Sequence, residues 1–516
     1  MLNLKKSLVK VTIAGALTAA ALLPFSSNLT AAKVTGVQGK KEISAQYSLK
    51  FNDGTYTIKT LTVGGETIEY RAYENIVYVS NPVDTEYQIM NFYVPEAYYE
   101  SASINEYTAE TAPIFFPNAI GGYNQAKPAT TARESVSVAL SNGYIVASPG
   151  ARGRTTQDEN GLYTGKAPAG IVDLKAAVRY LRYNDENMPG DAEKIIANGT
   201  SAGGAMTSLL GATGNSKDYE PYLQAIGAAN ERDDIFAVSS YCPITNLDHA
   251  DIAYEWLFNG VNTFVWGSRN GPLTDEQIKV SNELKALFPE YLNSLNLVDY
   301  EPRNTNGIGL KTAPGQLKKG TALTLDAHGN GPFKEYVKSF VIQSAQKAMD
   351  NGSNLSTYTW LTIKNGAVTD INLEEFVKYA TRMKSPPAFD SLGANSWEND
   401  LFGTESQNGQ HFTQYSFENS TVGGTLADSN IVKMMNPMNY IGTKGATTSE
   451  HWRIRHGSID RDTSLAIPVI LATKLENSGY NVDFELPWNV GHSGDYDLEE
   501  LFDWMDQISK GKNVKN

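Results

Sequence analysis

The chain has 516 residues, of which 41% are hydrophobic and 19% are charged, so it can bury a large core and is not expected to be disordered. Its formal net charge of −14 at pH 7 repels phosphate backbones, which excludes nucleic acid as a predicted partner. The single cysteine, Cys242, excludes intramolecular disulfides and metal sites built from cysteines.

The N-terminus has the pattern of a secretory signal peptide. Three lysines precede an apolar run over residues 11–25, and Leu-Thr-Ala-Ala at 29–32 suits cleavage. The apolar run is shorter than the ~20 residues that a transmembrane helix needs. We therefore predict that residues 1–32 are removed and that the mature protein is secreted without a membrane anchor. Their removal takes away three lysines and no acid, which moves the net charge from −14 to −17.

The next part of the chain predicts a sheet. Residues 45–110 alternate apolar and polar positions between turn signals, which is typical of antiparallel strands. Short apolar strands then alternate with helical periods, and such alternation favours a mostly parallel sheet. The strands expected here are residues 114–116, 144–147 and 194–197. The clearest helix places Ile171, Leu174, Val178 and Leu181 on one face.

The stretch from 243 to 435 lacks this alternation and predicts helices. Capping pairs mark two helix starts, Thr274 with Gln277 and Asn372 with Glu375, and the second helix is expected to end near Lys384. Another amphipathic helix is expected over residues 333–349. An insertion of this kind inside a sheet protein is typical of a lid.

The strand and helix alternation resumes after residue 436. Strands are expected at 452–455 and 482–486, and helices at about 465–475 and 498–508. We predict an α/β fold whose mixed, mostly parallel sheet is flanked by helices and interrupted by a large helix-rich lid domain. The predicted domains are a signal peptide at 1–32, a core at 33–242, the inserted lid at 243–435 and the rest of the core at 436–516.

The strongest chemical motif is Gly-Thr-Ser-Ala-Gly at residues 199–203, which lies between an apolar strand and a helical run. This is the nucleophile elbow of α/β-hydrolases, in which a sharp turn presents the serine hydroxyl at the start of a helix. Ser201 is therefore the predicted nucleophile, and the backbone N–H of Ala202 is the predicted first donor of an oxyanion hole. An ordinary turn rich in glycine and serine is the alternative interpretation.

A serine nucleophile needs a histidine base and a carboxylate that orients it, and this fold delivers them in that order of serine, acid and histidine. His492 lies in Gly-His-Ser-Gly at 491–494, just after the last predicted strand. Asp460 follows a strand end 32 residues earlier and is the preferred acid, although it could instead cap the next helix. Asp462 is the near rival and Asp495 a distant one. Such chemistry requires no cofactor or metal, and we predict none.

A second oxyanion-hole donor is expected from the loop after strand 114–116. Gly121 and Gly122 form a pair there that lets the backbone approach a substrate oxygen, and either could donate. An ordinary turn is again the alternative.

Together these motifs resemble the bacterial tannases, or tannin acyl hydrolases. The segments that carry the resemblance are residues 118–123, 199–204, 241–246, 455–463 and 491–495. The resemblance implies an α/β-hydrolase core with a lid inserted after the nucleophile half, a triad of Ser201, Asp460 and His492, and a galloyl ester as substrate. It also implies that Lys384, Glu398 and Asp462 bind the three galloyl hydroxyls. Without the resemblance, Lys384 reads as a cation at a helix end and Glu398 as a solvated loop charge.

Three other functions remain open at this point. A feruloyl esterase or general carboxylesterase would use the same triad with another acyl pocket. A serine peptidase of this fold usually carries an N-terminal propeller, for which residues 33–110 are too short. A non-catalytic binding module would not need the serine, acid and histidine set. In every case the predicted partner is a small molecule and the predicted oligomeric state is a monomer.

Overall fold

The computed structural model describes residues 46–299 and 320–511, so the predicted signal peptide lies outside the described residues. Within those ranges, one central sheet contains nine strands. They are β1 (Thr57–Val63), β2 (Glu66–Val77), β3 (Ile89–Pro95), β4 (Pro113–Pro117), β5 (Ile145–Pro149), β6 (Asp191–Thr200), β7 (Ala237–Tyr241), β12 (His451–Arg455) and β13 (Asn481–Glu485). Their spatial order is β1-β2-β3-β5-β4-β6-β7-β12-β13.

The sheet changes direction part-way across. β1, β2, β3 and β5 pair antiparallel, as the alternating pattern of residues 45–110 predicts. From β5 onward the strands β4, β6, β7, β12 and β13 pair parallel. All residues of β3, β4, β5 and β7 are buried, so these strands form the centre of the core. The loops after the parallel strands leave one common edge, and there the predicted catalytic residues lie.

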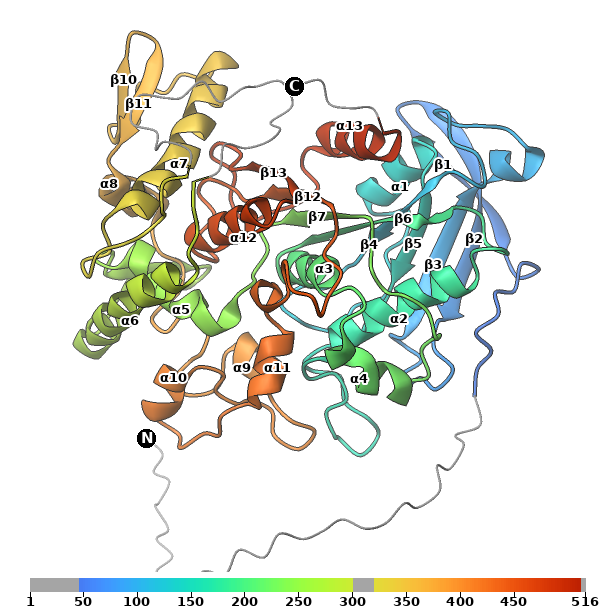
Figure 1. Ribbon diagram of the computed structural model, residues 1–516, viewed down its shortest axis with the longest axis horizontal. Helices are drawn as coiled ribbons and strands as arrows, with labels where there is room; N and C mark the ends of the chain where they lie inside the picture. The colour runs from blue at the N-terminus through green and yellow to red at the C-terminus, as the bar shows by residue number, and fades with distance from the viewer. Residues whose placement is uncertain (1–45, 300–319, 512–516) are drawn as a thin grey trace, which may run out of the picture. The chain divides into compact units, whose positions relative to one another are not determined.

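Helices cover both faces of this sheet. The core helices are α1 (Glu134–Ser141), α2 (Ala169–Tyr183), α3 (Ala202–Ala212), α4 (Glu220–Ala225), α12 (Ala466–Asn477) and α13 (Leu498–Ser509). Figure 1 shows α1 and α13 on one face and α2, α3 and α12 on the other. Phe502 of α13 packs its ring on Phe115 and Tyr144, which fixes the last helix against the core. The predicted α/β fold class is confirmed.

The segment between β7 and β12 is the insertion. It contains α5 (Leu247–Phe258), α6 (Asp275–Ser294), α7 (Pro332–Asp350), α8 (Leu373–Ala380), α9 (Trp397–Leu401), α10 (Gln414–Glu418), α11 (Ser429–Met434) and the hairpins β8 (Thr263–Trp266) with β9 (Arg269–Pro272) and β10 (Leu361–Lys364) with β11 (Ala367–Ile371). Thr274 and Gln277 form the predicted capping box. The predicted end of α8 near Lys384 is wrong, because Thr381 leaves the helix with a φ of 63°. Lys384 therefore lies in a loop, and the two hairpins were not predicted.

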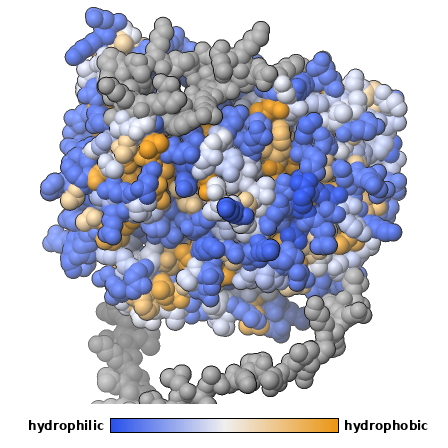
Figure 2. All heavy atoms as spheres, in the orientation of Figure 1, coloured by the Kyte–Doolittle hydropathy of each residue, from blue (hydrophilic) through white to orange (hydrophobic). Residues whose placement is uncertain are grey.

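None of the described helices is long and apolar enough to cross a membrane. Figure 2 shows one face of the molecule, on which hydrophilic side chains dominate and apolar ones form small separate patches. Single apolar side chains such as Ile58 and Val83 are exposed. Scattered exposure of this kind is normal for a folded surface.

Candidate active site

Ser201 lies at the turn between β6 and α3, in the strained conformation that the elbow motif predicts. Its φ of 62° and ψ of −126° are unfavourable for a residue with a side chain. The turn is tight enough that a Cβ at Gly203 would lie 2.6 Å from the Ile120 carbonyl oxygen, so the position requires glycine. The backbone N–H of Ser201 donates to Tyr241 of β7, which anchors the turn to the sheet. The serine thus stands at the N-terminal end of α3, where a negative charge is stabilised.

His492 and Asp460 come together from the loops that follow β13 and β12. Nδ1 of His492 lies 2.8 Å from Oδ2 of Asp460. The His492 loop packs against the elbow, because a Cβ at Gly494 would overlap the side chain of Thr200. Burial alone would lower the pKa of His492, but the hydrogen bond and the charge of Asp460 outweigh burial and raise it. Burial would raise the pKa of Asp460, but the two neighbouring imidazoles, His456 and His492, lower it.

The two rival acids have other contacts. Oδ2 of Asp495 accepts from the Arg133 guanidinium at 2.6 Å, and its Oδ1 accepts from Asn198 at 2.9 Å. Asp462 lies 3.6 Å from Nε2 of His492, on the side of the ring away from Asp460. Asp460 is thus the acid that faces Nδ1, the nitrogen that an orienting carboxylate must hold.

Cys242 and His456 form a buried wall behind Asp460. The Cys242 thiol donates to the Ser493 carbonyl oxygen at 3.3 Å, and burial raises its pKa, so it is not a thiolate nucleophile. Burial also lowers the pKa of His456. Ligand atoms of Cys242, His456 and Asp460 lie within 4.8 Å of one another.

Ser201 opens into a cavity of about 150 Å³. The three residues that the resemblance assigns to substrate binding, Lys384, Glu398 and Asp462, all line it. Lys384 comes from the loop after α8, Glu398 from α9, and Asp462 from the loop after β12. The structure thus gathers three charged side chains from distant parts of the chain around the nucleophile.

These charges are mutually dependent. Nζ of Lys384 lies 2.5 Å from Oδ1 of Asp462, and the Lys384 side chain is only 11% exposed. Burial would lower the pKa of Lys384, but Asp462 and Glu398 outweigh burial and raise it. Burial raises the pKa of Glu398, and the charge of Lys384 offsets part of that shift. A buried ammonium beside two carboxyl groups is suited to a ligand with adjacent hydroxyls, which can donate to the acids and accept from the lysine.

The predicted oxyanion-hole residues differ in position. Ala202, the first residue of α3, and Gly122 both line the cavity, whereas Gly121 does not. Gly122 has a φ of 54°, and a Cβ there would lie 3.0 Å from the Trp397 ring. A side chain at position 122 would therefore press on that ring.

Two aromatic lining residues were missed by the sequence reasoning. Trp266 of β8 and Trp397 of α9 border the cavity, and their rings pack nearly perpendicular with centroids 5.8 Å apart. One sequence contains no signal that joins a short hairpin to a helix more than 100 residues away.

The BD-FAE family model matches residues 119–263. A solved tannase of Fusobacterium nucleatum is 51% identical, with a TM-score of 0.83 over 90% of this chain and 100% of that one. The chain belongs to the bacterial tannases. The predicted α/β-hydrolase core with an insertion and the predicted enzyme class, a carboxylic ester hydrolase, are therefore confirmed.

Other tannase structures agree. A tannin acyl hydrolase in complex with ethyl gallate is 45% identical, and one in complex with 3,4-dihydroxybenzoate is 46% identical; each has a TM-score of 0.84 over 89% of this chain and 99% of its own. Esterase LipQ of Mycobacterium tuberculosis (strain ATCC 25618 / H37Rv) is 28% identical over 102 residues. That match covers 20% of this tannase and 23% of LipQ, so it spans less than a quarter of the curated relative.

Proposed function

We propose that this tannase hydrolyses galloyl esters through an acyl-enzyme. Oγ of Ser201 attacks the ester carbonyl carbon while Nε2 of His492 takes the hydroxyl proton and Asp460 holds the imidazole. The N–H groups of Ala202 and Gly122 stabilise the oxyanion. Collapse of the tetrahedral intermediate breaks the bond to the alcohol, which receives the proton from His492. Water, activated by the same base, then attacks the acyl-enzyme and releases gallic acid and Ser201.

One observation carries the choice of substrate: Lys384, Glu398 and Asp462 line the same cavity as Ser201. An acyl group without hydroxyls would cover these charged side chains and offer them no hydrogen bonds in place of those to water. The ligands named in the solved relatives, ethyl gallate and 3,4-dihydroxybenzoate, carry such adjacent hydroxyls and support the proposal.

The decisive assay compares kcat/KM for methyl gallate, methyl protocatechuate, methyl ferulate and methyl benzoate. We expect gallate to be hydrolysed fastest, protocatechuate next, and the other two slower by about 100-fold or more, because each missing hydroxyl removes a hydrogen bond to a buried charged side chain. Glu398→Ala is expected to narrow the gap between gallate and benzoate. Equal rates on all four esters would contradict galloyl specificity and leave a serine esterase of broad range, the alternative that the similarity to an esterase over 102 residues favours.

We further propose that the enzyme is secreted after removal of residues 1–32 and acts as a monomer on small molecules. The basic and apolar pattern of those residues supports secretion. Mass spectrometry of the protein from culture medium tests it: an intact N-terminus on cell-associated protein would contradict secretion.

A further inference from the structure

The loop that carries Lys384 is laid along one face of α5. This loop, residues 382–390, is called the strap here. Arg382 begins the strap and pairs with Glu255 of α5 at 2.5 Å, and both side chains are fully buried. At the other end, the backbone N–H groups of Phe389 and Asp390 donate to the two carboxylate oxygens of Asp251 at 2.7 and 2.9 Å. Residues 251 and 255 are four apart, so they share one helix face.

Tyr254 lies on that face and joins two of the substrate-binding residues. Its hydroxyl accepts from the backbone N–H of Met383 at 3.0 Å and of Lys384 at 3.1 Å. The same hydroxyl donates to the carbonyl oxygen of Arg461 at 3.0 Å. Arg461 immediately precedes Asp462, so one buried oxygen atom fixes the backbone beside both partners of the Lys384–Asp462 ion pair.

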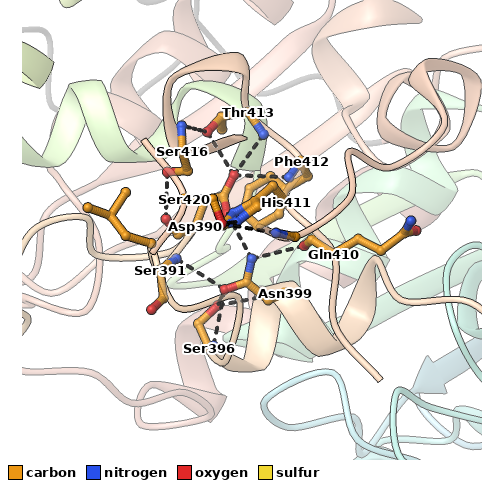
Figure 3. Close-up of polar contacts among 12 residues, drawn as sticks. Asp390, Ser391, Ser396, Asn399, Gln410, His411, Phe412, Thr413, Ser416 and Ser420 are labelled. Atoms are coloured by element: carbon orange, nitrogen blue, oxygen red, sulfur yellow. Dashed lines mark hydrogen bonds and ion pairs between the residues drawn. The ribbon is translucent and has the colours of Figure 1, made fainter. Parts of the chain in front are cut away.

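Glu398 is held from the same helix through a longer connection. The backbone N–H of Asp390 donates to Asp251, as described above. Oδ1 of Asp390 accepts a hydrogen bond from the side-chain amide of Asn399 at 2.7 Å. Oδ1 of Asn399 in turn accepts from the backbone N–H of Ser396, the N-cap of α9, at 3.1 Å. Figure 3 shows Asn399 between Asp390 and Ser396 at the centre of this network. Asn399 thereby sets the start and direction of α9, the helix that carries Glu398.

The geometry points to α5 as the element that sets the galloyl selectivity of this enzyme. Tyr254 positions Lys384 and Asp462, and Asp251 positions Glu398 through Asp390 and Asn399. None of these residues lines the cavity, so they act through the residues that do. This inference rests on the proposed function, because it presumes that the three charged residues bind galloyl hydroxyls.

The physical reason is that the three charges are useful only at fixed separations. A displaced ammonium would still pair with a carboxylate, but it would no longer match adjacent phenolic oxygens. Simple esters, which lack those hydroxyls, do not depend on this match. Loosening α5 is therefore expected to reduce turnover of gallate esters and to spare simple ones, a pattern that a general loss of stability does not produce.

Tyr254→Phe removes only the bridging hydroxyl and tests this directly. We expect kcat/KM for methyl gallate to fall about tenfold, mostly through KM, and kcat/KM for p-nitrophenyl acetate to change less than about twofold. The matched control is Tyr219→Phe, since Tyr219 is equally buried and its hydroxyl donates to the Met434 carbonyl oxygen. The control should leave the ratio of the two substrates unchanged.

A double-mutant cycle distinguishes positioning from an independent effect. In a Lys384→Met background, Tyr254→Phe should lower gallate turnover by less than about threefold, because the residue that it mainly positions is gone. Full additivity of the two substitutions would overturn the inference. Asn399→Ala provides a second route should Tyr254→Phe not fold: it should narrow the selectivity for gallate over benzoate as Glu398→Ala does.

The outcomes distinguish failure of the proposed function from failure of the inference about α5. If the wild-type enzyme shows no preference for gallate, the proposed function fails. If the wild type prefers gallate and Tyr254→Phe and Asn399→Ala keep that preference in full, the proposed function stands and the role of α5 is refuted.

Discussion

The protein contains two sets of an aspartate, a histidine and a serine, the first at the sheet edge and the second in the insertion. At the sheet edge, Nδ1 of His492 lies 2.8 Å from Oδ2 of Asp460, and Ser201 occupies the strained turn after β6. In the insertion, Oδ1 of Asp390 lies 2.8 Å from Nδ1 of His411, and Nε2 of His411 lies 2.9 Å from the hydroxyl of Ser420. Figure 3 shows this second set, Asp390, His411 and Ser420, among the loops around α9 and α10.

The two sets differ in their exposure and in their hydrogen bonds. His492 is 26% exposed, and its Nε2 points towards a cavity residue, whereas His411 is fully buried with both ring nitrogens paired. The Ser420 hydroxyl also accepts from the backbone N–H of Gly424 at 3.1 Å, so it has little freedom to attack a substrate. Three residue types in a row therefore do not make a nucleophile, which also needs a strained turn and an open space. We expect the first set to catalyse ester hydrolysis and the second set to stabilise the fold.

The nucleophile gives the largest expected effect. Ser201→Ala should reduce methyl gallate turnover by roughly 10⁵-fold or more, while the matched Ser420→Ala should keep it within about threefold. Both proteins are to be compared by single-substrate kinetics and by circular dichroism. Substantial turnover by Ser201→Ala, or its loss in Ser420→Ala, would reverse the comparison.

The orienting acids should separate next, and by pH as well as by rate. His492 must be neutral to accept a proton, so kcat/KM should fall as pH drops through its pKa, which Asp460 raises above the ordinary value of 6.5. Asp460→Asn removes the carboxylate that raises this pKa, so the acid limb should move to lower pH while kcat falls about 10⁴-fold. Asp390→Asn should leave the acid limb in place.

Rate profiles between pH 4 and pH 9 on methyl gallate would measure both shifts. A displaced acid limb in Asp390→Asn would show that the buried second set takes part in ester hydrolysis.

The sequence predicted the pairing of Asp460 with His492 far better than the contacts of His411. The elbow at Ser201 and the strand-end positions of Asp460 and His492 follow from a local motif and from the chain order that the fold imposes. The sequence does not single out His411, because its partners Asp390 and Ser420 lie in loops without any periodic pattern. Loops of this kind are held by side-chain hydrogen bonds, and no propensity records those.

The same reasoning explains the errors in the insertion. The sequence predicts the end of α8 near Lys384, just before the prolines at 386 and 387, but Thr381 turns the chain towards α5. That turn serves tertiary contacts between the strap and Tyr254, which override helix propensity. The convergence of Lys384, Glu398 and Asp462 came from family resemblance alone, because their loops meet only in the folded chain.

The histidines should show a crossover between stability and activity. His411→Ala leaves the buried Asp390 carboxylate without one of its partners and should lower the free energy of unfolding by about 3 kcal/mol. His492→Ala should lower it by less than about 1 kcal/mol, because that ring is partly exposed, yet abolish turnover. Urea denaturation followed by tryptophan fluorescence measures the free energy of unfolding. Equal destabilisation by the two substitutions would remove the distinction.

The smallest expected effect concerns the cavity beside Ser201, for which the second set has no counterpart among the residues that line it. Gly122 bounds the cavity with a φ of 54°, and an added Cβ would press on the Trp397 ring at 3.0 Å. Gly121 has no atom within 4 Å of its Cβ position and does not line the cavity. Gly122→Ala should therefore lower kcat/KM for methyl gallate by about tenfold through strain and displacement of Trp397, while Gly121→Ala should change it less than about twofold. If Gly121→Ala were instead the damaging substitution, the second oxyanion donor would be assigned to the wrong glycine, and the space in front of Ser201 would be bounded differently from the cavity described.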